Sequence, residues 1–430
     1  TDTSAPARAA RDFVRGGHWR SFADRYAEAA RMQARTTQLR QLAETRLPAP
    51  DAVLAPDVRA AAVLDHLARA RCNDAYWHGV FGGLYLPHLR AAIWAHLAQA
   101  EGLLRAGQPL AVEWVGAPDG VGRELYVHSS EFAAFVALDR GGALVELTGF
   151  RAALNLADVL TRRREAYHRL TAAPPVSAPM MAPGMSPEMS PAMSPATSPA
   201  PAHAPEGMPG SAGTPSIHDR EHEAHFTRLP PFDAGLRTLS AVRVVSQALT
   251  PEAWQQRAFE PVHDWARARA DACTPATTPH ASDGESLTLE LRFDGPGSLE
   301  QTLEFTARGE VELRYAWDPA AFPPQAWFAV ELSLAREVPL HFDEAPGAAH
   351  DAAHDVGPGA ASGAGPSAIW RYEIGTEARS ERGIERVVQG VSLTPVWPVA
   401  AGRCALRFAL PVGLVVEQSP EHHADDADDD

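Results

Sequence analysis

The sequence predicts an α+β multidomain protein, in which an N-terminal helical bundle is followed by a large antiparallel β-sandwich. Apolar residues recur at helical spacing through residues 1–106, whereas from about Pro109 they alternate with polar residues, as in strands. Residues 172–216 form a tract of Pro, Ala, Ser and Met, which cannot bury enough apolar surface to fold. We therefore expect a disordered linker that interrupts the sandwich.

Two helices are predicted within the helical domain, residues 1–106. One begins at Pro87, because proline suits the first position of a helix. Its apolar residues fall on a single stripe formed by Leu89, Ile93, Leu97, Ala100 and Leu104. The other helix runs from about Asp57 to Arg71.

Short strands separated by turns predict the sandwich, to which we assign residues 107–171 and 217–418, followed by an acidic tail, 419–430. The first hairpin turns at Asp139-Arg-Gly-Gly142, because paired glycines favour tight turns. Strands are expected at Leu125–Val127, Phe132–Leu138, Ala143–Leu147, Ser286–Phe293, Gln301–Thr306, Val311–Trp317, Ala326–Leu334, Arg386–Val391 and Ala405–Leu410. Helices are expected as exceptions at Ala153–Leu170 and Pro251–Arg269.

The composition excludes several classes of chemistry. All 38 basic side chains among the 430 residues are Arg, so the chain has no lysine for a Schiff base or a phosphate-binding loop. Its three cysteines are too few and too scattered for a disulfide framework, which favours a reduced, cytoplasmic setting. A net charge of −16 without a basic stripe argues against nucleic acid and membrane partners. We find no dinucleotide fingerprint and predict no cofactor.

Three groups of side chains have metal-binding atoms, but a solvated role suits each group better. The linker holds six of the seven methionines, residues 218–225 hold three histidines, and His422 and His423 precede the acidic tail. No cysteine accompanies the histidines, and acidic termini are ordinarily solvated. The sequence therefore predicts no metal site.

The strongest functional candidate lies between the two predicted helices, in residues 71–87. Asn73, Asp74, Trp77 and His78 place an amide, a carboxylate, an indole and an imidazole within six residues. Sugars are bound by aromatic faces together with planar hydrogen-bonding groups, so this mixture suits a carbohydrate site. The alternative is a turn whose aromatic residues fill a core and whose Asn and Asp cap a helix.

The stretch Cys72–Arg90 resembles the signature of glycoside hydrolase family 57, in its α-amylase/4-α-glucanotransferase branch. It reads Cys-Asn-Asp-Ala-Tyr-Trp-His-Gly-Val-Phe-Gly-Gly-Leu-Tyr-Leu-Pro-His-Leu-Arg. Further stretches resemble the same family in the same order, namely Phe13–Phe22, Gly141–Leu147, Asn155–Leu160 and Ser216–Asp219. The resemblance spans about residues 11–415.

This resemblance implies the family's central helical domain and a C-terminal sandwich of mutarotase-like form, without the catalytic barrel. Family members carry a Glu nucleophile and an Asp acid/base in an N-terminal (β/α)₇ barrel and act by retaining double displacement. No catalytic residue is therefore expected in this chain. The segment matching Asn73–His78 is implied to pack against that barrel and to present Trp77 to the glucan cleft. Trp77 is thus the first substrate-binding candidate, supported by His78, Asn73 and Asp74.

Two functions remain open. The first is the non-barrel part of an α-glucan-processing enzyme, either a hydrolase or a 4-α-glucanotransferase. Its partners would be α-1,4-glucans or maltooligosaccharides and the catalytic barrel of the parent chain, and alone it should bind glucan without cleaving it. The second is a free-standing, non-catalytic carbohydrate-binding or scaffold protein. An open reading frame upstream of Thr1 that encodes a barrel would favour the first.

Overall fold

The fold is taken from a computed structural model of the 430-residue chain. The structure describes residues 19–47, 57–78, 82–120, 122–168, 170, 226, 228–280, 284–342, 365–380 and 383–411. The chain divides into two compact units, one formed by Thr1–Arg163 with Pro230–Asp430 and the other by Arg164–Leu229. The predicted linker, 172–216, and the acidic tail, 419–430, lie outside the described residues. The predicted domain boundaries stay predictions.

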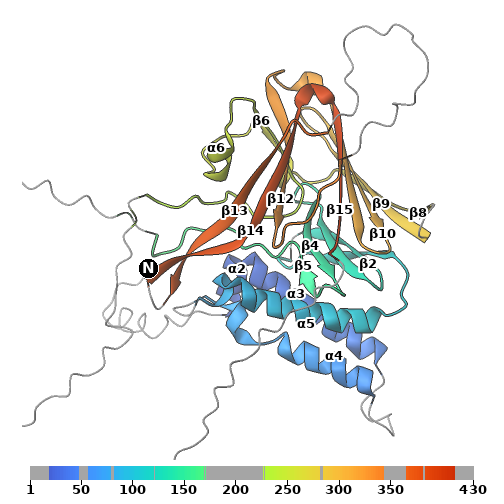
Figure 1. The fold of residues 1–430 in the computed structure, drawn as a ribbon. Helices are drawn as coiled ribbons and strands as arrows, with labels where there is room; N and C mark the ends of the chain where they lie inside the picture. Colours follow the sequence, from blue (N-terminus) through green and yellow to red (C-terminus); the bar gives the residue numbers. More distant parts are fainter. Residues whose placement is uncertain are drawn as a thin grey trace, which may run out of the picture. The chain divides into compact units, whose positions relative to one another are not determined.

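Four helices from the N-terminal part of the first unit gather below its sheets in Figure 1. They are α2 (Trp19–Arg25), α3 (Ala27–Arg46), α4 (Val58–Arg69) and α5 (Pro87–Arg105), with two short 3-10 turns between α4 and α5, η2 (Asn73–Tyr76) and η3 (Gly83–Tyr85). Asp57 begins α4, because its side chain accepts from the N–H groups of Arg59 and Ala60 at 2.9 and 3.1 Å. Pro87 begins α5 as predicted. None of the helices in the described ranges has the length and apolar character needed to cross a membrane.

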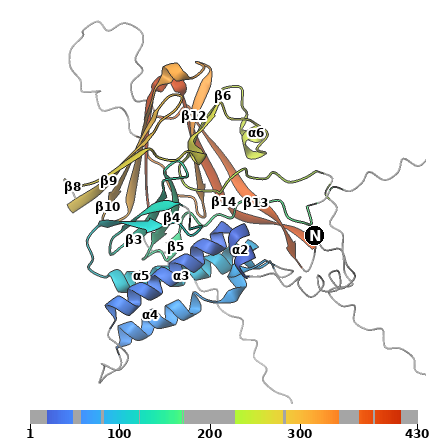
Figure 2. The ribbon, with the colours of Figure 1, turned by 180° about the vertical axis from the view of Figure 1, so that it is seen from behind.

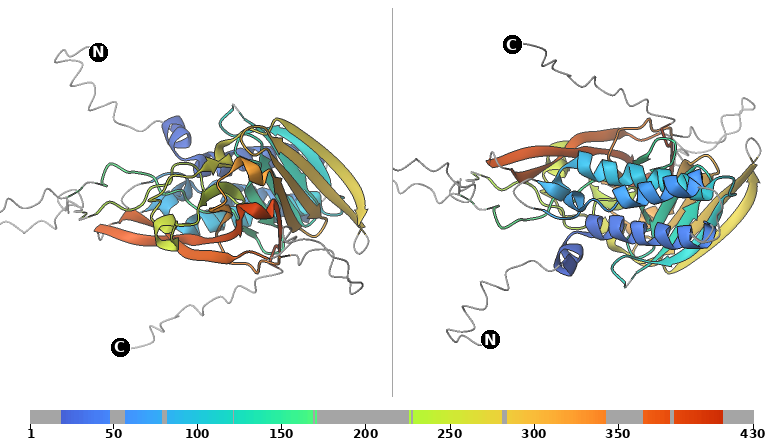
Figure 3. Two further views of the ribbon diagram at one scale, coloured as in Figure 1. Left: turned by 90° about the horizontal axis from the view of Figure 1, so that it is seen from above. Right: turned by 90° about the horizontal axis from the view of Figure 1, so that it is seen from below.

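Helix α5 is buried on two sides. The predicted stripe, including Ile93 and Leu97, packs with α3 and α4 in one apolar core. Figure 3 shows these three helices side by side when the molecule is viewed from below. Ala98, on another side of α5, packs against Tyr126 and Phe135 of the first sheet. Helices α3 and α5 therefore both face the first sheet, and α4 lies on their far side (Figure 2).

The described strands form three five-stranded antiparallel sheets, which confirms the α+β class. The first sheet has the order β1 (Ala111–Gly116), β2 (Arg123–His128), β3 (Phe132–Ala137), β4 (Ala143–Gly149), β5 (Leu154–Asn155). The second has the order β15 (Arg403–Ala409), β11 (Glu310–Trp317), β10 (Leu299–Thr306), β9 (Gly284–Phe293), β8 (Ala272–His280). The third has the order β13 (Ala368–Ser380), β14 (Gly383–Pro398), β12 (Ala326–Leu334), β6 (Ala241–Ser246), β7 (His263–Asp264).

One continuous apolar core joins residues of all three sheets. Alternate residues of β10 and β11 are buried, so their period of two places one face of the second sheet in this core. Trp317 of β11 stacks on Phe328 of β12 with ring centroids 3.8 Å apart. The hairpin predicted at Asp139–Gly142 is also present, because Gly141 and Gly142 adopt φ of 66° and 64°, which glycine tolerates best.

The helix predicted at Ala153–Leu170 is wrong over the described residues 153–168. Ala153 has a left-handed φ of 49°, which ends any helix there. The Asn155 side chain accepts from the N–H groups of Leu147 and Ala157, both at 3.0 Å, and this holds the chain beside β4. Local polar bonds of this kind compete with helix formation.

The helix predicted at Pro251–Arg269 is largely wrong. Only α6 (Pro251–Gln255) and the short turn η4 (Trp265–Arg267) are helical. Arg257 has a left-handed φ of 55°, and Pro261 follows before the chain joins the third sheet as β7.

The second unit is described at few residues. Leu170 and Phe226 form an isolated parallel bridge. The ring of His168 lies 5.4 Å from that of Phe226, and its Nδ1 accepts from the N–H of Glu165 at 2.9 Å.

Candidate functional site

The candidate segment connects α4 to α5 through η2 and η3. Gly79, Val80 and Phe81 within it lie outside the described residues. Tyr76 and Tyr85 are buried, at 4% and 1% exposure, in the core of the helices. For the two tyrosines this matches the alternative in which aromatic residues of the segment fill a core.

Tyr76 fixes the end of η2. Its hydroxyl donates to the carbonyl oxygen of Ala70 at 2.7 Å and lies 3.3 Å from the hydroxyl of Thr36 in α3. Burial raises the pKa of Tyr76, so the phenol keeps its proton and remains a hydrogen-bond donor. Trp77 is the next residue, so the backbone on its N-terminal side is held in place by Tyr76.

Trp77 is half-buried, and its backbone is extended. Its carbonyl oxygen accepts from the N–H of Leu84 at 2.7 Å, which draws η3 back against η2. Gly83 allows this approach, because it has a φ of 50° and a Cβ there would lie 2.1 Å from the Trp77 carbonyl oxygen. The backbone of Trp77 is thus fixed, while the residue as a whole is only half-buried.

His78 is half-buried beside Trp77. Its Nδ1 lies 3.2 Å from the carbonyl oxygen of Gly82, and its ring lies 4.2 Å from the ring of Tyr85. A carbonyl oxygen can only accept, so in this geometry Nδ1 carries a proton and donates it to Gly82.

Asn73 and Asp74 are exposed at the beginning of η2. Neither side chain caps this turn within the part of the chain that the structure describes, so the predicted capping role is not found. The structure brings Trp77 and His78 together at one end of η2 and places Asn73 and Asp74 at the other. An exposed amide and carboxylate can hydrogen-bond to a polyhydroxylated ligand, and an indole can stack on it.

A cavity of about 590 Å³ lies elsewhere in the first unit. Charged side chains line it, and they form pairs such as Glu28 with Arg163 at 2.7 Å and Arg31 with Glu124 at 2.5 Å. Burial acts to raise the pKa of Glu28, but the Arg163 guanidinium outweighs it and holds this pKa below its ordinary value. None of the four predicted site residues lines this cavity, so it is separate from the candidate segment.

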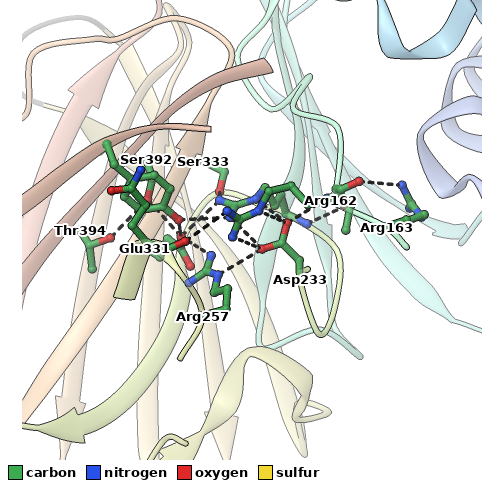
Figure 4. A network of polar contacts seen from close by, with 12 residues as sticks. Arg162, Arg163, Asp233, Arg257, Glu331, Ser333, Ser392 and Thr394 are labelled. Atoms are coloured by element: carbon green, nitrogen blue, oxygen red, sulfur yellow. Dashed lines mark hydrogen bonds and ion pairs between the residues drawn. The ribbon is translucent and has the colours of Figure 1, made fainter. Parts of the chain in front are cut away.

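The sequence did not single out any pair of carboxylates, but the structure places two in a buried network (Figure 4). Asp233 accepts from three guanidinium groups, those of Arg162, Arg237 and Arg257, at 2.7–3.2 Å. Burial acts to raise the pKa of Asp233, yet these cations hold it well below its ordinary value. The carboxylate is therefore ionised at neutral pH.

Glu331 is the second carboxylate of this network. It accepts from Arg257 at 2.6 Å, from Arg243 at 3.1 Å and from the hydroxyl groups of Tyr372 and Ser392, both at 3.0 Å. The pKa of Glu331 also lies well below its ordinary value, because the guanidinium groups outweigh the effect of burial. Saturated, ionised carboxylates suit a rigid structural link better than proton transfer.

Two family models match the chain. The model described as "Alpha-amylase/4-alpha-glucanotransferase, middle domain" matches residues 17–104, and the model described as "Alpha-amylase/4-alpha-glucanotransferase, C-terminal" matches residues 119–181. The first match contains the whole candidate segment.

Curated relatives match as well. The chain is 29% identical over 413 residues to a 4-alpha-glucanotransferase of Thermococcus kodakarensis, covering 93% of this chain and 53% of the relative. It is 41% identical over 161 residues to an alpha-amylase of Pyrococcus abyssi, covering 37% of this chain and 22% of the relative. The chain spans about half the length of the glucanotransferases that it matches.

A solved structure shares the fold. The crystal structure of the 4-alpha-glucanotransferase from Thermococcus litoralis aligns with a TM-score of 0.58 and 22% sequence identity. The alignment covers 94% of this chain and 54% of that chain.

Proposed function

Because the chain belongs to the α-amylase/4-α-glucanotransferase branch of glycoside hydrolase family 57, we propose that it serves an α-glucan-processing enzyme as a glucan-binding portion. In this role its helices and sandwich support the catalytic barrel of the parent chain and contribute one wall of the glucan cleft. The substrate class is α-1,4-glucan or maltooligosaccharide. Trp77 is the main contact, and His78, Asn73 and Asp74 assist it.

The observation that carries this proposal is the state of Trp77. Its backbone is held by Leu84 and by the buried neighbour Tyr76, whereas the residue as a whole is only half-buried. A large apolar side chain costs free energy where it faces water, so a tryptophan that is held in place but only half-buried suits a ligand that covers it. A sugar ring offers an apolar face to the indole and hydroxyl groups to Asn73 and Asp74.

Affinity for maltoheptaose, measured by isothermal titration calorimetry on the 430-residue chain, tests the proposal. Trp77→Ala should weaken binding by about tenfold, the loss expected for one stacked aromatic ring. The matched control is Trp114→Ala, because Trp114 is 45% exposed on β1, outside the segment. Equal affinity of Trp77→Ala and the unaltered chain would contradict the proposal.

Incubating the chain with maltoheptaose also tests whether it binds glucan without cleaving it. We expect maltoheptaose to be bound without release of reducing ends and without redistribution of chain lengths, because no residue here is assigned to bond cleavage. Robust turnover by the purified chain would show that a catalytic carboxylate pair lies within it.

A further inference from the structure

Arg90, the last residue of the stretch Cys72–Arg90, is fully buried at the beginning of α5. Its guanidinium donates in three directions. Nη1 donates to the carbonyl oxygen of Leu84 at 2.6 Å, Nε to Asp158 at 2.9 Å, and Nη2 to the side-chain oxygen of Gln389 at 2.9 Å. The Arg90 side chain therefore joins η3 to Gln389 of β14, which lies 299 residues away from Arg90 in the sequence.

Gln389 completes this arrangement from the sandwich. It is 2% exposed, and its amide nitrogen donates to the carbonyl oxygen of Tyr85 and to the hydroxyl of Thr376, both at 2.8 Å. Two successive carbonyl groups of η3, those of Leu84 and Tyr85, are thus held by the pair Arg90 and Gln389, which we call the clamp. Buried polar groups of this kind are costly to leave without partners.

The clamp reaches the helices because the β13–β14 hairpin extends beyond its sheet toward them (Figure 1). The pairing of β13 and β14 shifts register between Ile374 and Gly375, as in a β-bulge, which bends a strand. Beyond this point Ala378 and Val387 pack into the core of the helices. The hairpin therefore presents Gln389 to η3 from a two-stranded support that packs against the helices.

Trp77 lies one hydrogen bond from the clamp. Leu84 uses its carbonyl oxygen to accept from Arg90 and its N–H to donate to the carbonyl oxygen of Trp77. We propose that Arg90 and Gln389 are positioning residues for the glucan contact, so that the sandwich hairpin sets the place of Trp77. This inference rests on the proposed function and adds a role for the sandwich in glucan binding.

Gln389→Met tests the clamp, because methionine is similar in size to glutamine but lacks its amide. It therefore loses both the oxygen that accepts from Arg90 and the N–H that donates to Tyr85. The matched control is Gln301→Met, because Gln301 is equally buried in β10 and bonds to Gly142, away from η3. Hydrogen exchange of a peptide covering residues 82–88 reports on η3, where the N–H groups of Leu84, Tyr85 and Leu86 are bonded within the segment.

In Gln389→Met, exchange in this peptide should be at least tenfold faster and maltoheptaose affinity at least fivefold weaker, with neither change in Gln301→Met. Thr376→Val provides a milder test if Gln389→Met folds poorly, because it removes only the hydroxyl that accepts from Gln389. It should shift both measurements in the same direction.

Unchanged exchange and affinity in Gln389→Met, or equal changes in Gln301→Met, would overturn the clamp. A different result separates the two proposals. If exchange rises in Gln389→Met but Trp77→Ala binds maltoheptaose as the unaltered chain does, the proposed function fails and the glucan role of the clamp fails with it.

Discussion

Arg35 of α3 and Glu146 of β4 form a buried ion pair, with 2.9 Å between Nε and Oε1 and exposures of 2% and 0%. The same guanidinium pairs with Glu101 of α5 and lies 4.7 Å above the ring of Phe135. The helices and the first sheet are therefore joined through buried charges as well as apolar contacts. Such a junction tolerates the loss of one partner poorly, because the remaining charge stays buried.

Arg35→Met should lower the free energy of unfolding by about 3–5 kcal/mol, because it removes the cation paired with buried Glu146 and leaves Glu101 with Arg105 alone. Urea unfolding followed by circular dichroism measures this change. Arg40→Met on the same helix is the control, since Arg40 pairs with Glu44 at 3.6 Å in solvent and should change stability by about 0.5 kcal/mol or less. Equal effects of the two substitutions would contradict the importance of the buried pair.

The acid stability of the protein should depend on Asp233. Its pKa in the folded state lies below the unfolded value, so the unfolded chain takes up the proton first as the pH falls. Its stabilising effect is complete above about pH 5 and is lost as the pH falls through about 4 and below. Asp233→Asn should therefore lower the melting temperature at pH 7 and reduce its further fall between pH 6 and 3.5.

The remaining slope in Asp233→Asn should come partly from Glu331, whose pKa is lowered in the same way. Glu300→Gln, which alters an exposed pair with Arg292, should keep the full pH dependence. Parallel melting profiles for Asp233→Asn and the unaltered chain would show that this carboxylate is not coupled to folding as described.

Gly83→Ala should disturb the turn beneath Trp77. Alanine is conformationally strained at a φ of 50°, and its Cβ would also collide with the Trp77 carbonyl oxygen. We expect a loss of about 2–3 kcal/mol in the free energy of unfolding and weaker maltoheptaose binding. Gly120→Ala separates the two causes, because Gly120 has a φ of 74° with open space around it and should cost only about 1 kcal/mol. A Gly83→Ala variant as stable as Gly120→Ala would argue against the tight turn.

Much of the fold was predictable because local signals and tertiary contacts agree there. The strand predicted at Ala326–Leu334 has the observed bounds, and the helix from Pro87 begins where its proline indicates. The signals failed where a side chain redirects the backbone. Asn155 binds the N–H of Leu147 and prevents a helix whose composition looked favourable, and no periodicity reveals such a bond.

Part of the candidate site could be predicted because its residues are close together in the sequence. The cluster of Asn73, Asp74, Trp77 and His78 is contiguous, so its unusual composition stands out in the sequence. Arg90 ends the same stretch, and an arginine within a helix that carries an apolar stripe was an available signal. Gln389 gave no signal, because its partners lie 299 and 304 residues away and only the fold brings them together.

The most direct test of the central claim, that Trp77 contacts glucan, is the nuclear magnetic resonance signal of its indole N–H during titration with maltoheptaose. Trp77→Phe assigns the signal among the ten tryptophans. The account predicts a saturable shift of the Trp77 resonance, with the Trp114 resonance unchanged. A Trp77 resonance that stays in place while the chain binds maltoheptaose would contradict it.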